Sequence, residues 1–186
     1  MPESAPDYLE LCRAGRLSHF DAMASYFAFT PTDDAALHAL LSATEPDPDF
    51  QTAVAKLRAA SWDLIIVSAG SCWYIDKILA ASGVTAVVHS NPGHIEIGRG
   101  LVIKKPTSSP FFSAEVGIDK AAVVRDAAKR FKQVAFAGDG PPDVEPALLV
   151  RPHLRFARDF LAHELQRRGE KFRSFERWAD IVRGIV

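Results

Sequence analysis

Two aspartates follow a short apolar run, in the stretch VAFAGDGPPD at 134–143. Glycines flank Asp139, so the backbone can turn sharply there and approach a ligand closely. Asp143 lies four residues further on, about one helical turn, so that both carboxylates can face one point. Carboxylate oxygens together with water suit Mg²⁺. The spacing therefore predicts a metal site at Asp139 and Asp143. The alternative is structural, with Asp139 holding a turn and Asp143 capping the next helix.

A second apolar run, Leu64–Val67, ends in a small polar turn formed by Ser68, Ala69 and Gly70. The turn comes directly before a predicted helix, whose N-terminus favours an anion. The Ser68 hydroxyl and the amides of Ala69 and Gly70 would then point to the carboxyl edge of the sheet, where they could bind an anion. The alternative is a plain junction between a strand and a helix.

Lys120 opens the amphipathic helix predicted over 119–131. A lysine ammonium at this place can reach the active-site edge of the sheet and neutralise carboxylates and phosphate there. The alternative is a solvated surface lysine. Lys104 and Lys105 are competing candidates, and we expect them on an exposed strand end.

The elements that must position these residues alternate between strands and helices. This alternation predicts an α/β fold with a mostly parallel sheet, and such sheets bind ligands at the carboxyl ends of their strands. Residues 5–45 are predicted to form a small helical segment with no strand, and residues 46–186 to form the α/β core. A β-hairpin is expected near 94–103. The remaining predicted strands are 62–67, 85–89, 134–137 and 154–157, and the core helices are 50–60, 72–81, 119–131, 144–149, 160–168 and 175–185.

Composition limits the classes of function. The 186 residues are 48% hydrophobic, which suits one globular domain. A net charge of −1 argues against a nucleic-acid surface. Cys12 and Cys72 match no metal spacing and are expected to be free thiols in a reducing compartment. Neither a secretory signal nor an apolar run near ~20 residues is present, so we expect a cytoplasmic protein with no membrane partner.

The three motifs resemble those of the haloacid dehalogenase (HAD) superfamily. VSAG at 67–70, Lys120 at a helix start and GDGPPD at 138–143 resemble its second, third and fourth motifs in order and spacing. The chain looks like the phosphoserine-phosphatase-like branch. It is most similar there to the methionine-salvage phosphatases that act on 2-hydroxy-3-keto-5-methylthiopentenyl-1-phosphate. LRFARDF at 154–160 and GRLS at 15–18 carry that narrower resemblance.

The resemblance implies a HAD-like Rossmannoid parallel sheet flanked by helices, with a helical cap at 5–45. It also implies a Mg²⁺-dependent phosphomonoesterase for a small phosphorylated metabolite. By this resemblance Ser68 and Lys120 are catalytic, and Ser68, Ala69, Gly70 and Lys120 bind the phosphoryl group. Asp139 and Asp143 would hold the metal, Asp143 directly or through water.

One part of the family pattern is missing. The first motif, an apolar strand followed by D-x-D-G, supplies the nucleophile, the general acid and the central strand. The nearest string is Asp47-Pro-Asp49, which has no preceding strand and no following glycine. Pro141 and Pro142 also replace residues that include a substrate-binding Asn in phosphoserine phosphatases, which argues against an amino-acid substrate.

Two explanations of the missing motif are open. We expect an N-terminally truncated form, because a missing central strand leaves hydrogen-bonding edges open. The alternative is an inactive binding or interaction module, in which a second copy or a partner fills the gap. A HAD-type dehalogenase or phosphotransferase is a third option.

Overall fold

The computed structural model describes residues 6–44 and 46–186. Packing divides them into two units, each with its own apolar core. The first comprises 6–44, Ile66–Ala81 and Val87–Ile118, and the second comprises Pro46–Ile65, Ser82–Ala86 and Asp119–Val186. No helix among the described residues has both the length and the apolar character needed to cross a bilayer.

The first unit begins with three short helices. Each starts at a side chain that accepts a hydrogen bond from the first turn: Asp7, Ser18 and Asp33. The helices are α1 (Tyr8–Arg13), α2 (His19–Phe27) and α3 (Asp34–Ala43). Ala5 and Glu45, the ends of the predicted cap, lie outside the described residues. The division into a cap at 5–45 and a core at 46–186 stays a prediction.

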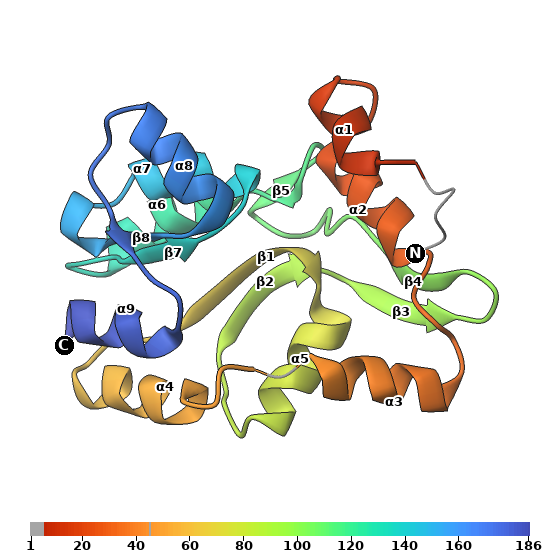
Figure 1. Cartoon of the computed structure of the whole chain (residues 1–186), viewed down its shortest axis with the longest axis horizontal. Helices are drawn as coiled ribbons and strands as arrows, with labels where there is room; N and C mark the ends of the chain where they lie inside the picture. Colours follow the sequence, from red (N-terminus) through yellow and green to blue (C-terminus); the bar gives the residue numbers. More distant parts are fainter. Residues whose placement is uncertain (1–5, 45) are drawn as a thin grey trace. The chain divides into compact units, whose positions relative to one another are not determined.

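The rest of the first unit consists of strand pairs and one helix (Figure 1). β1 pairs with β2, β3 with β4 and β5 with β6. β3 and β4 form an antiparallel hairpin, in which Gly93 faces Ile103. Its buried residues Leu101 and Ile103 pack against Phe20 of α2. The elements are β1 (Ile65–Ser71, which enters this unit at Ile66), α5 (Cys72–Ala81), β2 (Val87–Asn91), β3 (Gly93–Glu96), β4 (Gly100–Ile103), β5 (Phe112–Ser113) and β6 (Gly117–Ile118).

The second unit contains a parallel sheet in the order β7-β8-β9. Leu161 and Leu165 of α8 are fully buried in the apolar core that this helix shares with the sheet. In a separate cluster, Leu57 of α4 packs against Val182 of α9, and Figure 1 shows these two helices side by side. The elements are α4 (Phe50–Ala59), α6 (Lys120–Arg130), β7 (Phe136–Gly138), the 3₁₀ helix η1 (Pro141–Asp143), α7 (Val144–Leu148), η2 (Pro152–Leu154), β8 (Arg155–Ala157), α8 (Asp159–Arg167), β9 (Arg173–Ser174) and α9 (Trp178–Ile185).

These elements confirm the predicted α/β class with a parallel sheet and flanking helices. They also correct one boundary at the expected phosphate-binding turn. The strand predicted over 62–67 is β1, which starts at Ile65 and runs through Ser71, so that Ser68 to Gly70 lie in the strand. The strands β5, β6 and β9 were not predicted, because two residues are too few to show an alternating pattern.

The strand order leaves β7 with one partner. Among the described strands, β7 is hydrogen-bonded only to β8, and β1 only to β2. Each therefore has one edge whose backbone groups have no strand neighbour in the described part of the chain. β7 is the strand that delivers Asp139, so its edge bears on the candidate site.

Candidate active site

Asp143 holds the turn that follows β7. One carboxylate oxygen, Oδ2, accepts hydrogen bonds from the backbone amides of Asp139, at 3.0 Å, and Gly140, at 2.9 Å. The residue is only 2% exposed. The structural alternative considered for these aspartates assigned the turn to Asp139. It is Asp143 that organises the turn, by reaching back over η1 rather than by capping α7.

Gly138 makes room for this carboxylate. A Cβ atom added at Gly138 would lie 2.6 Å from the Cγ atom of Asp143, which is too close for any real side chain. Gly140 differs, since its φ is −113° and a Cβ there would be 3.6 Å from the nearest atom, in Pro142. The close approach that requires glycine is therefore to Asp143.

Lys120 lies next to the other oxygen of Asp143. Its Nζ atom is 2.6 Å from Oδ1, and the two side chains are 15% and 3% exposed. Lys120 reaches this place because α6 starts there, capped by Asp119, whose carboxylate accepts from the amide of Ala122. Both oxygens of Asp143 are thus engaged within the protein, by an ammonium and by two backbone amides.

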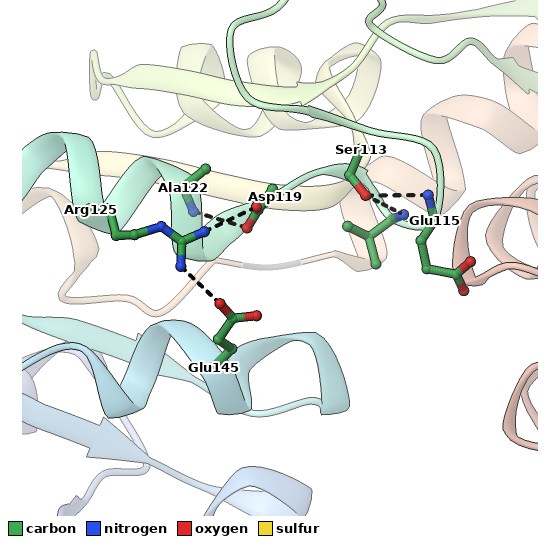
Figure 2. A network of polar contacts seen from close by, with 7 residues as sticks. Ser113, Glu115, Asp119, Ala122, Arg125 and Glu145 are labelled. Atoms are coloured by element: carbon green, nitrogen blue, oxygen red, sulfur yellow. Dashed lines mark hydrogen bonds and ion pairs between the residues drawn. The ribbon is translucent and has the colours of Figure 1, made fainter.

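A surface network ties α6 to α7 (Figure 2). Arg125 of α6 donates to Glu145 of α7 at 2.8 Å and to Asp119 at 3.3 Å. The hydrogen bond to Glu145, with the nearby charge of Asp119, raises the pKa of Arg125 above its usual value. The network links the start of α6, where Lys120 stands, to the helix that follows Asp143.

Asp139 presents a freer carboxylate than Asp143. Its side chain is 55% exposed, and the nearest cation is the guanidinium of Arg158, 3.6 Å from Oδ2. In the parallel register Gly138 faces Ala157, so that Asp139 and Arg158 follow directly at the carboxyl ends of β7 and β8. Of Asp139 and Asp143, Asp139 is therefore the carboxylate that is accessible to a ligand.

The predicted phosphate-binding residues lie at the end of β1, in the first unit. The Ser68 hydroxyl accepts a hydrogen bond from the amide of Gly70 at 3.0 Å. A Cβ at Gly70 would meet the hydroxyl of Tyr74 at 1.7 Å, so this glycine permits close packing of α5. Buried Asn91, at the end of β2, donates from Nδ2 to the carbonyl of Ala69 at 2.7 Å.

The structure brings together three of the six predicted site residues. Lys120, Asp139 and Asp143 meet in the second unit, while Ser68, Ala69 and Gly70 form their own cluster in the first. That the two groups share one site stays a prediction. Sequence reasoning missed Asn91 and Arg158. Each lies at or directly after the carboxyl end of a short strand that contains polar residues, VVHSN for β2 and RFA for β8, so the uninterrupted apolar run that pointed to Ser68 is absent there.

The donor set fits Mg²⁺ in part. Among residues 6–44 and 46–186, no group of three or more His, Cys, Asp or Glu residues is placed to hold a metal ion. Mg²⁺ commonly uses one or two protein carboxylates and completes its shell with water and substrate phosphate. Asp139 fits such a ligand. Asp143 fits a supporting role, because its oxygens already accept from Lys120 and the turn amides.

Comparison with known proteins decides the family. No curated protein sequence matches the chain, but the family model for haloacid dehalogenase-like hydrolases matches residues 3–148. The chain belongs to the haloacid dehalogenase-like hydrolase (HAD) family. This confirms the resemblance drawn from the three motifs, while the narrower branch stays a prediction.

Solved structures share the fold of this HAD protein. A probable phosphoserine phosphatase from Vibrio cholerae matches with a TM-score of 0.64 and 17% identity, over 95% of this chain and 54% of its own. A HAD family hydrolase from Salmonella enterica serovar Typhi matches with a TM-score of 0.60 and 17% identity, over 90% and 56%. A phosphoserine phosphatase solved as a phospho-aspartyl intermediate analogue matches with a TM-score of 0.60 and 14% identity, over 91% and 78%. The HAD chain thus spans about half the length of the first two.

Proposed function

We propose that this HAD protein is a Mg²⁺-dependent phosphomonoesterase acting on a small phosphorylated metabolite. The observation that carries the proposal is the arrangement at the end of β7. An exposed carboxylate, Asp139, lies beside a buried Lys120–Asp143 ion pair that holds the turn. Solved phosphoserine phosphatases share the fold, and one is described as an analogue of a phospho-aspartyl intermediate.

The residues divide the work as follows. Asp139 is the ligand that would hold Mg²⁺, which supplies charge neutralisation at a phosphoryl group when bound. The Asp143 side chain holds the turn at Asp139 in place, and the Lys120 ammonium balances the negative charge of Asp143. Ser68 and the amides of Ala69 and Gly70 would hold phosphoryl oxygens. Such a site works mainly by positioning and by electrostatic stabilisation of the transition state.

The nucleophile is the missing part of this proposal. The carboxylate of a nucleophilic aspartate attacks phosphorus, the bond to the leaving alcohol breaks, and a general acid protonates the leaving oxygen. Water then hydrolyses the aspartyl-phosphate. No apolar strand followed by D-x-D-G occurs in the 186 residues. We infer that a strand carrying these aspartates lies outside them and pairs with the open edge of β7.

Hydrolysis of p-nitrophenyl phosphate with Mg²⁺ tests the proposal. We expect negligible turnover from the 186-residue chain, because loss of a nucleophile that acts within a unit costs many orders of magnitude in rate. Co-expression with the segment encoded upstream should restore turnover, and Asp139→Ala should abolish it again. Asp126→Asn, a change to another carboxylate of the second unit paired with Arg130, serves as the matched control. Robust turnover by the chain alone would contradict the claim of a missing nucleophile.

A second candidate function is that of a non-catalytic binding or interaction module built on the same fold. In the part of the chain that the structure describes, β1 and β7 each have one edge without a strand neighbour, and this favours the candidate, since such an edge can accept a strand from a second copy or a partner. This candidate expects a stable oligomer or heterocomplex. A concentration-independent monomer in light scattering, together with an upstream reading frame that encodes D-x-D-G, would favour the phosphatase. A cytoplasmic setting is proposed for both.

A further inference from the structure

Arg158 stands beside Asp139 for reasons of backbone geometry. The amide of Arg158 donates to the carbonyl of Gly138 at 3.2 Å, and the amide of Leu161 donates to the carbonyl of Asp139 at 3.0 Å. These bonds join the end of β7 to the start of α8 on both sides of the aspartate. The position of Arg158 is therefore set by the sheet register and does not depend on its side chain.

The guanidinium of Arg158 is supported independently of Asp139. It lies over the ring of Phe175, 5.3 Å from the centroid, and donates to the carbonyl of Glu176 at 3.4 Å. Its approach to Asp139 is 3.6 Å, an ion-pair distance longer than a normal hydrogen bond. Asp159 lies equally far from it, at 3.6 Å, and offsets part of its charge. The cation can therefore stay in place when Asp139 takes another partner.

We propose that Arg158 competes with a divalent cation for the Asp139 carboxylate and so lowers the Mg²⁺ affinity of the site. The inference rests on the proposed function, which assigns Mg²⁺ to Asp139. A fixed positive charge close to a metal ligand opposes a second positive charge at that ligand. Arg158 and Asp139 are both about half exposed, so water screens the effect and keeps it moderate.

A Mg²⁺ titration of the 186-residue chain, followed through the amide NMR signal of Gly140, measures this effect without any turnover. We expect Arg158→Gln to lower the Mg²⁺ dissociation constant about two- to fivefold, the range of exposed ion pairs. Arg158→Lys keeps the charge and should bind Mg²⁺ like the wild type. Arg151→Gln makes the same change in net charge at an exposed arginine that has no ion pair with Asp139, and it should leave the constant unchanged. Asp139→Ala should abolish the shift.

The outcomes separate this inference from the proposed function. An Asp139-dependent shift with the same or weaker affinity in Arg158→Gln would overturn the role of Arg158 and leave the metal site standing. Tighter binding in Arg151→Gln as well would reduce the effect to net charge and also overturn it. If neither the wild type nor Arg158→Gln shifts Gly140, then the metal assignment and the inference both fail. A thermal melt of each variant confirms that the proteins compared are folded.

Discussion

At the scale of single residues, the turn after β7 depends on a side chain four positions away. Asp143 bonds the amides of Asp139 and Gly140 and pairs with Lys120 while almost fully buried. A buried carboxylate is tolerated only when such partners satisfy it. The same bonds leave Asp139 as the carboxylate that faces outward.

Gly138 should be far less tolerant of substitution than Gly140. Gly138→Ala drives a methyl group against the Asp143 carboxylate, and we expect it to lower the free energy of unfolding by about 1–3 kcal/mol, as overpacking usually does. Gly140→Ala meets only ordinary contacts and should change stability by less than about 0.5 kcal/mol. Urea denaturation of both variants measures the difference. Equal losses would show that Asp143 does not restrict position 138.

At the scale of elements, buried Arg155 ties the start of β8 to its surroundings. Its guanidinium donates to the carbonyls of Ala147, Val150 and Lys171 and to the carboxylate of Glu170. One side chain thereby satisfies the end of α7 and the segment before β9. A cation with only 3% exposure is retained because every partner is present.

Arg155→Met should destabilise the second unit strongly. Methionine replaces the apolar stem but removes the hydrogen bonds to three carbonyls and the ion pair with Glu170, and we expect a loss of about 2–4 kcal/mol. Arg151→Met changes an exposed arginine and should cost less than about 0.5 kcal/mol. Chemical denaturation checks both values. Wild-type stability in Arg155→Met would show that the hydrogen bonds of Arg155 make no net contribution to the free energy of unfolding.

Glu164 gives helix α8 a defined acid sensitivity. Hydrogen bonds from Arg167 and Arg168 lower the pKa of Glu164 from 4.5 to about 2. Because the pKa of Glu164 is lower in the folded state, the ionised carboxylate stabilises the fold fully above pH 4.5, and this stabilisation disappears as the pH falls toward 2. Glu164→Gln should therefore be less stable than the wild type at pH 7, and the two should converge near pH 2. Urea midpoints between pH 2 and 7 test this, with Glu176→Gln as the control that should follow the wild type throughout.

At the scale of the whole molecule, each unit has its own core. Leu101 and Phe20 belong to the core of the first unit, and Leu161 and Leu165 to that of the second. Local stability in proteins follows such cooperative packing units. A core change in one unit should therefore act first on the elements of that unit.

Hydrogen exchange should show this division. Leu161→Ala removes a fully buried side chain, which typically costs about 2–5 kcal/mol, and should speed exchange in β7, β8 and α8. Leu101→Ala should speed exchange in the β3–β4 hairpin and α2 instead. Mass spectrometry of peptides from both variants measures the pattern. Uniform loss of protection across the chain in either variant would show one cooperative unit.

Local sequence patterns were enough to predict the elements that carry Lys120 and Asp139. Apolar runs that end in glycine and aspartate gave the strand before Asp139, and the periodic spacing of residues 119–131 gave α6 with Lys120 at its first turn. These features depend on neighbouring residues, whose periodicity is visible in the chain itself. Together with the VSAG stretch they were enough to indicate the HAD family, which the family comparison confirms.

Tertiary structure decided what each carboxylate does. Nothing in the spacing of Asp139 and Asp143 shows that Asp143 is buried against Gly138 and bonded to Lys120, since that requires α6 to pack against η1. Arg158 likewise approaches Asp139 only through the register of β7 and β8. The chain alone shows which groups can bind and which short elements carry them. Pairing between distant segments decides which groups are buried and which remain free, because burial and register arise from contacts that sequence separation conceals.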